Sequence, residues 1–187
     1  MDLRMVKTRK SIRAAYMELR AQYPLERIRV KRLCELALIN KTTFYKHYQD
    51  VYALAEEVED ETITAIMNSF ESIGKLYADP ERFMSGLYAA FVAHKQLIFT
   101  LFNGRMNVLL EKVQRQLVAH YPAIGLEAHK EILLSFLIKG ASHVLMEAKY
   151  EEKVMLQTLT RAARQIIEAL GRTRIKGQKV PVRLFRD

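Results

Sequence analysis

A run of polar and basic side chains at residues 41–47, reading K-T-T-F-Y-K-H, is the part of this sequence best suited to bind another molecule. With Phe44 turned inward, every other side chain in the run is a cation or a hydrogen-bond donor, and none is acidic. Such groups bind phosphate oxygens and the polar edges of nucleobases. The six side chains are Lys41, Thr42, Thr43, Tyr45, Lys46 and His47.

Two short helices joined by a tight turn are expected to position this run. The spacing of apolar residues predicts helices on both sides of a turn near Leu38, and Asn40 is a favourable N-cap for the second helix. This is helix-turn-helix spacing. Leu33 and Ala37, packed against Phe44, would hold the second helix where it can enter a DNA major groove. Helix pairs with short turns also occur in many other all-α folds.

The positive charge of the chain is concentrated at its two ends. The chain has 187 residues and a formal net charge of +9. Residues 1–50 carry 12 Lys or Arg against 5 Asp or Glu, residues 51–170 are net −3, and residues 171–187 are net +5. A basic module on a near-neutral body favours a polyanion partner, most often nucleic acid. Basic ends that only favour solubility are the alternative.

Residues 7–54 resemble the TetR/AcrR family of bacterial transcription regulators. The resemblance is carried by I-x-V-x-x-L at residues 28–33 and I-N-K-T-T-F-Y-K-H-Y at residues 39–48, together with the apolar stripe of the first helix. The T-F-Y-K-H-Y motif is most similar to the subgroup that includes regulators of dihydroxyacetone kinase operons. Two positions depart from the family pattern. Leu38 stands where a turn glycine is usual, which favours a slightly different turn. Val51 replaces a common phosphate-binding lysine.

The resemblance implies a cytoplasmic, homodimeric repressor that binds a palindromic operator in double-stranded DNA under the control of a small-molecule effector. The alternative is a regulator of the same fold, which could be an activator, that a protein partner controls and that has no small-molecule pocket. Base contacts would fall on residues 41–43. Tyr45 and His47 would contact backbone phosphates or flanking bases, and the start of the preceding helix would bind phosphate. The predicted DNA-binding residues are Val30, Lys31, Arg32, Asn40, Lys41, Thr42, Thr43, Tyr45, Lys46 and His47.

Apolar periodicity predicts an all-α fold of about nine helices. The expected domains are a helix-turn-helix head at 1–50, an effector-binding and dimerisation body at 51–171 and a basic tail at 172–187. Thr8 is the expected N-cap of the first helix, and Leu36 is expected to be buried. A short strand-like stretch lies at 180–185. The expected helices span residues 8–22, 30–37, 40–48, 49–74, 81–94, 96–102, 105–121, 126–150 and 152–170.

The composition excludes several classes of protein. Half of the residues are hydrophobic, which excludes a disordered basic tail. No apolar run approaches the roughly 20 residues of a membrane span, and no apolar segment of a signal peptide follows the first residues. A single cysteine, Cys34, excludes an internal disulfide and fits a reducing cytoplasm. We therefore expect no membrane partner.

No constellation of residues indicates catalysis, so we expect no enzyme, metal or cofactor. Cys34 fits a small buried residue better than a nucleophile. His143 and Glu147, at i and i+4, lack a third metal ligand and fit a polar pair in a packed interface. His94 fits a helix-end or surface residue better than a pH sensor.

The body is expected to hold the effector and the dimer interface. In the family resembled, the body helices enclose an effector pocket, and its candidate polar anchors here are Tyr88, His94, Asn103, Arg105 and Asn107. Two apolar stripes predict a four-helix interface between two chains, although packing inside a monomer is the alternative. The stripes comprise Leu133, Phe136, Leu137, Gly140, Ala141, Val144, Leu156, Leu159, Ala163, Ile166 and Ile167.

Overall fold

The chain is predominantly helical in the residues that its computed structural model describes, which are 3–69, 79–120, 128–147 and 149–172. This part contains eight α-helices and one short 3₁₀ helix, Leu25–Arg27, and no strand. The all-α prediction is confirmed. The helices are α1 Leu3–Arg20, α2 Val30–Leu36, α3 Lys41–Tyr45, α4 Val51–Asn68, α5 Pro80–Phe102, α6 Met106–His120, α8 Ala128–Glu147 and α9 Glu152–Arg172.

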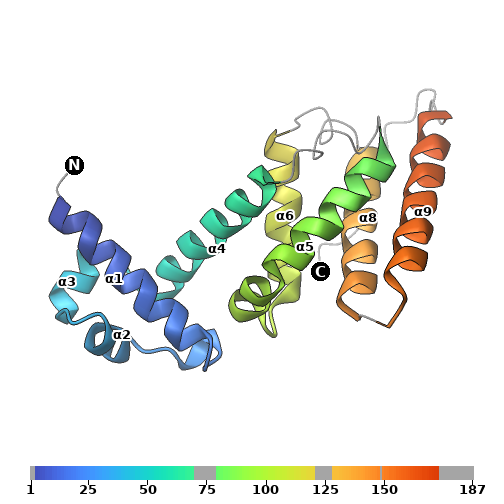
Figure 1. The fold of residues 1–187 in the computed structure, drawn as a ribbon. Coiled ribbons are helices and arrows are strands. Elements are labelled where there is room, and N and C mark those ends of the chain that lie inside the picture. Colours follow the sequence, from blue (N-terminus) through green and yellow to red (C-terminus); the bar gives the residue numbers. More distant parts are fainter. Residues whose placement is uncertain (1–2, 70–78, 121–127, 148, 173–187) are drawn as a thin grey trace, which may run out of the picture.

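The helices form a head and a body joined by α4. Figure 1 shows α1, α2 and α3 together at one end of the molecule and α8 and α9 at the other, with α4 leading from the head toward α6. Helix α9 packs against α5 and α8, and α1 also touches α5. A single apolar core runs from Ile12 in the head to Ala163 in α9.

The head interior is built by the apolar stripe of α1. Ile12, Tyr16, Leu33 and Phe44 are all fully buried and belong to one apolar core, so the stripe of α1 shares its core with residues from both short helices. Each large side chain buried in this way stabilises the fold by about 1.5–3 kcal/mol relative to the exposed state. The packing that holds α3 at the surface was therefore predictable from helical spacing.

Local capping signals fix the starts of three helices. The Asn40 side chain accepts a hydrogen bond from the Thr43 backbone N–H at 2.7 Å, which confirms the predicted N-cap. Asp50 caps α4 in the same way through the Ala53 N–H at 2.7 Å. Pro80 begins α5, where its missing N–H costs nothing because no partner would be available.

Two helix boundaries differ from the predictions. Helix α1 begins at Leu3, so Thr8 lies inside it, and its hydroxyl donates to the Arg4 carbonyl at 2.9 Å instead of capping the helix. The predicted helices at 81–94 and 96–102 are one continuous helix, α5. Neither proline nor glycine interrupts the residues between them, so nothing there breaks the backbone hydrogen bonds.

Two further differences concern the helix-turn-helix. Helix α3 ends at Tyr45, and a turn closed by hydrogen bonds from the His47 and Tyr48 N–H groups to the Phe44 carbonyl completes the predicted 40–48 segment. Leu36 is 42% exposed, because Leu33 and Cys34 supply the buried face of α2. The predicted strand at 180–185 and the tail from residue 173 lie outside the described residues. None of the described helices is both long and apolar enough to span a membrane.

Candidate nucleic-acid interface and body cavity

The surface of α3 presents unpaired positive charge. Lys41 and Lys46 are exposed, as is Lys31 at the start of α2, and none of these ammonium groups enters an ion pair with another described residue. Thr42 and Tyr45 are exposed beside them, and Thr43 and His47 are half-buried. This surface is therefore available to a polyanion.

Three of the predicted contact residues already have internal partners. The Arg32 guanidinium lies 4.5 Å from the centroid of the Tyr23 ring and donates to the Tyr23 hydroxyl at 3.0 Å. The Asn40 carbonyl oxygen caps α3, and Val30 packs against the core. These three residues therefore stabilise the helices that form the interface, and they offer fewer free groups to a bound molecule. Val51 is buried at the start of α4, so it cannot replace the lysine that commonly contacts phosphate there in the family resembled.

Helix α2 ends in a Schellman motif that places Leu38 in the left-handed region. The Ile39 N–H donates to the Cys34 carbonyl at 3.0 Å and the Leu38 N–H to the Glu35 carbonyl at 3.4 Å, while Leu38 has a φ of 54°. Glycine is usual at this position because a Cβ is unfavourable by roughly 1–2 kcal/mol there. The expectation of a different turn at Leu38 is wrong, because the two backbone hydrogen bonds impose the left-handed residue.

An ion-pair network attaches the head to α4. The Arg9 guanidinium pairs with the Glu57 carboxylate and donates to the Tyr48 hydroxyl at 3.2 Å, and that hydroxyl donates to Glu57 at 2.9 Å. Burial alone would raise the pKa of Glu57, but the hydrogen bonds from Arg9 and Tyr48 lower it below its ordinary value. Arg13 pairs with Glu61 one turn further along α4. The charges of Arg9 and Arg13 are therefore engaged within the chain.

A buried charge cluster lies where the head meets the body. Glu59 of α4 is 1% exposed, and its carboxylate accepts from Arg105 at 2.7 Å and lies 3.6 Å from the Lys112 ammonium. Lys112 is also buried and pairs with Asp60 at 2.5 Å. Removing one partner from such a cluster leaves an uncompensated buried charge and costs about 3–5 kcal/mol. These contacts join α4 firmly to α6.

Arg20 is a second buried charged group at this junction. Its guanidinium donates to the Tyr23 carbonyl at 2.8 Å and to the Leu101 carbonyl at 2.7 Å. Leu101 lies in the last turn of α5, whose carbonyls have no partner within the helix, so Arg20 caps α5 from the head. Nearby, burial and the charge of Glu59 raise the pKa of the Tyr16 hydroxyl to about 12.

Sequence reasoning missed these buried charges, although one signal was present. Glu59 lies four residues after Ala55 and four before Ile63, both buried, so helical spacing placed it on the buried face of α4. A charged residue on such a stripe indicates a buried partner. Nothing in the sequence indicated that Arg105 and Lys112, more than 40 residues away, supply it.

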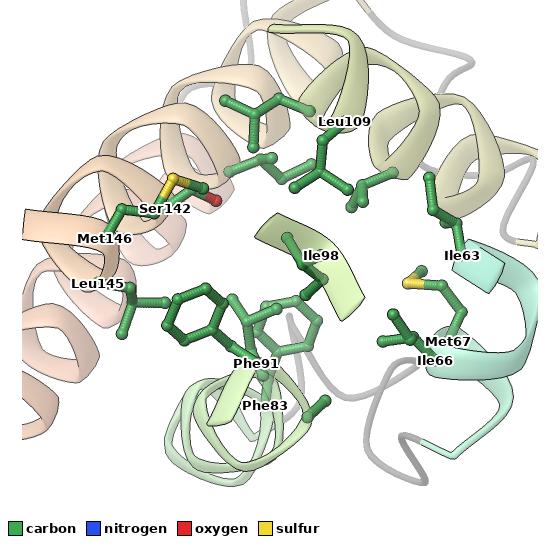
Figure 2. A pocket seen from close by; sticks show the side chains of 15 residues that line it. Ile63, Ile66, Met67, Phe83, Phe91, Ile98, Leu109, Ser142, Leu145 and Met146 are labelled. Carbon is green, nitrogen blue, oxygen red and sulfur yellow. The ribbon is translucent and has the colours of Figure 1, made fainter. Parts of the chain in front are cut away.

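The body contains an apolar cavity of about 80 Å³. Figure 2 shows side chains from several helices pointing into a common space, with the Ser142 hydroxyl as the only polar side-chain group among the fifteen lining residues. Typical ligand pockets measure roughly 300–1,000 Å³, so this cavity holds only a small molecule. Its lining is Ile63, Ile66, Met67, Phe83, Leu87, Ala90, Phe91, Ile98, Leu109, Leu110, Val113, Ile138, Ser142, Leu145 and Met146.

The five predicted effector anchors do not line this cavity. Arg105 is engaged by Glu59, and Asn103 and Asn107 are exposed near the α5–α6 connection. His94 is half-buried on α5. On the same helix, burial and the nearby Glu152 carboxylate raise the pKa of the Tyr88 hydroxyl. The physical reason is that polar side chains on these amphipathic helices lie away from the apolar space that the stripes enclose.

Part of the predicted dimer stripe is buried inside the single chain. Leu133, Ala141 and Ala163 are at most 6% exposed, so they face the chain's own core. Leu137, Val144, Leu156 and Leu159 are half-buried, and the side chains of Ile166 and Ile167 lie outside the described residues. Phe136 is 64% exposed and Gly140 is also exposed.

The exposed part of α8 forms an apolar ridge beside a groove. Ile132 is 70% exposed and lies one turn before Phe136, and Gly140 lies one turn after it. A surface groove of about 500 Å³ runs between this ridge and Gln114 of α6. A Cβ at Gly140 would meet nothing within 4 Å, so another helix could approach closely there. We call Ile132, Phe136 and Gly140 the α8 ridge.

The remaining candidate sites behave as ordinary structural residues. Cys34 is buried, as predicted, and desolvation raises the pKa of its thiol. His143 lies 3.6 Å from Glu147, and its side chain is 76% exposed, so the pair is on the surface of this chain rather than within its packing. Among the described residues no group of three or more His, Cys, Asp or Glu could hold a metal ion.

Comparisons of the chain with known protein families, with curated proteins and with solved structures found no match.

Proposed function

We propose that this chain is a sequence-specific DNA-binding transcription regulator that inserts α3 into the major groove. The observation that carries the proposal is the surface formed by α3 and its C-cap residue. Lys41, Thr42 and Lys46 are exposed there, neither lysine is ion-paired with another described residue, and Phe44 is buried on the opposite face. The net charge of +7 on residues 1–50 supports a polyanion partner. The resemblance of residues 7–54 to the TetR/AcrR family favours the role of a cytoplasmic repressor for this regulator.

Selection from random duplex DNA with the full chain, followed by affinity measurement at several salt concentrations, tests this proposal. We expect a preferred sequence. Lys41→Ala or Lys46→Ala should weaken binding and reduce the salt slope by about 1, because each variant neutralises one phosphate fewer. Lys153→Ala is the matched control, because Lys153 is an exposed lysine of α9 and lies outside both the head and the lining of the α8 groove. Equal enrichment of all sequences would contradict the proposal.

We propose a homodimer formed through the α8 ridge. An exposed Phe136 next to the unobstructed Gly140 supports close contact with a second copy, and a dimer supplies two heads for a palindromic operator. Phe136→Glu should convert the dimer to a monomer in light scattering. Val92→Glu is the control, because Val92 is 52% exposed on α5 and lies outside the ridge. A wild-type chain that is monomeric at micromolar concentration would contradict the dimer.

The cavity supports control by a small apolar effector. Ile63, Ile66 and Met67 of α4 line it on the helix that also carries Glu57 and Glu59, so a ligand there would bear directly on the connection to the head. Thermal-shift measurements with small aromatic compounds such as benzene and phenol test this. We expect these compounds to raise the unfolding temperature of the wild-type chain. They should have no such effect on Ala90→Phe, in which the added ring fills the cavity.

The size of the cavity favours a second candidate, a regulator that a protein partner controls. A volume of about 80 Å³ is too small for a drug-sized effector. In that case small compounds would leave the unfolding temperature unchanged, and DNA affinity would change only when the partner protein is present.

A further inference from the structure

Leu38 combines two unfavourable features that a glycine would remove. Its side chain is 91% exposed, more than any other large hydrophobic residue among those described. It is also the only described non-glycine residue with a positive φ. A strained residue that gains nothing from burial points to a role outside the folded chain.

The position of Leu38 indicates what its side chain can meet. It lies two residues before Asn40, the N-cap of α3, and therefore beside the end of α3 that carries the exposed Lys41 and Thr42. These neighbours offer only polar contacts, so Leu38 adds an apolar group to an otherwise polar surface. The Schellman hydrogen bonds fix the backbone from which that group projects.

We propose that Leu38 is a specificity-determining residue that contacts the 5-methyl group of a thymine in the operator. The inference rests on the proposed DNA-binding function. Among the base-pair edges in the major groove, thymine alone presents a methyl group, and apolar side chains recognise it by contact. An exposed leucine beside cationic and hydroxyl side chains matches such an edge, because the polar neighbours bind phosphate or base edges while the isobutyl group covers the methyl.

The test removes the methyl group alone. In the sequence selected by the wild-type chain, each thymine is replaced in turn by deoxyuridine, which lacks only the 5-methyl group, and dissociation constants are measured by fluorescence anisotropy at fixed salt. We expect that replacing one particular thymine of a half-site lowers the affinity of the wild-type chain by about fourfold. This is the change in affinity that corresponds to burying one methyl group. Leu38→Gly and Leu38→Ala should bind the thymine and deoxyuridine forms equally.

Two controls keep the result specific. Leu36→Ala changes another exposed leucine of the same segment, which has ordinary helical geometry, and should retain the wild-type thymine preference. Leu38→Gly should keep at least the wild-type unfolding temperature, because glycine accepts the left-handed conformation.

An unchanged thymine preference in Leu38→Gly, a loss of that preference in Leu36→Ala, or no methyl-sensitive thymine in the half-site would overturn the assignment of Leu38 while leaving the proposed function standing. Failure to select any sequence would overturn the proposed function, and this assignment with it.

Discussion

The helix-turn-helix and the body differ in where they place lysine and phenylalanine side chains. In the head, Phe44 is fully buried, and Lys41 is exposed and makes no ion pair with another described residue. In the body and at its junction with α4, Glu59 and Lys112 are buried, while Phe136 is exposed. The head is therefore a filled core under a charged surface. The body has a cavity and an apolar ridge that a second molecule can fill or cover.

The largest expected difference between the regions concerns two phenylalanines. Phe44→Ala should lower the free energy of unfolding by about 3–5 kcal/mol, because it opens a cavity in the head. Phe136→Ala should change the free energy of unfolding of the isolated chain by less than about 0.5 kcal/mol, because its ring is largely exposed, and should instead weaken the proposed dimer. Urea denaturation at low protein concentration measures both. Equal losses would show that the two regions are packed alike.

The charged residues offer the next comparison. Glu59→Gln should lower the free energy of unfolding by about 3 kcal/mol, because Arg105 would lose its carboxylate partner and the buried Lys112 would keep only the partly exposed Asp60 as a counter-charge. Glu61→Gln is the matched control on the same helix, and the pair that Glu61 makes with Arg13 is half-exposed and worth at most about 1 kcal/mol. The same denaturation experiment checks both variants. A loss for Glu59→Gln no larger than the control would contradict the importance of the cluster.

The same small-to-large substitution should have opposite signs in the two regions. Ala15→Val should destabilise the chain by about 1–3 kcal/mol, because Ala15 is 5% exposed in the filled head core. Ala90→Val places two methyl groups in the cavity and should stabilise it by up to about 1 kcal/mol. Thermal unfolding measures the difference. Destabilisation by both variants would show that the cavity is not open to added atoms.

The smallest expected effect is a pH dependence at the head–α4 contact. The pKa of Glu57 is lower in the folded chain than its ordinary value of 4.5, so the unfolded state binds more protons at acidic pH. The contacts of the ionised Glu57 carboxylate stabilise the fold by about 1 kcal/mol. This stabilisation is complete above about pH 5 and is lost as pH falls through the pKa of Glu57 in the folded chain. Glu57→Gln should remove this part of the acid sensitivity, whereas Glu56→Gln should not. Urea denaturation at several pH values measures this. If the free energy of unfolding of Glu57→Gln depends on pH as that of the wild type does, the assignment of this acid sensitivity to Glu57 is wrong.

The accuracy of the sequence predictions differed with the range of the interaction involved. Asn40 was assigned correctly because a cap acts within one turn of its helix. Thr8 was misassigned because its hydroxyl can equally bond back inside a longer helix. Leu36 was misassigned because the short α2 buries a face centred on Leu33 and Cys34.

In the candidate site, too, the local features were predictable and the contacts between distant residues were not. Residues 41–47 follow from local chemistry and from their spacing to Leu33, so the sequence identified the surface of α3. The internal partners of Arg32 and Arg9 are Tyr23 and Glu57, and their engagement became visible only in the folded chain. None of the five effector anchors lines the apolar cavity, and Arg105 instead lines a separate pocket with Glu59 and Lys112. Periodicity gives the polarity of a helix face and does not say which space that face adjoins.

The sequence by itself determined that the chain is helical, where several helices begin and which short segment carries the exposed cations, because these properties depend on neighbours within a few residues. Only the tertiary structure decided that Glu59 meets Arg105 and Lys112, that Arg20 caps α5 and that Phe136 remains uncovered. Such interactions join residues tens of positions apart. Their energies come from desolvation and packing, which are set by how whole helices dock rather than by any local pattern.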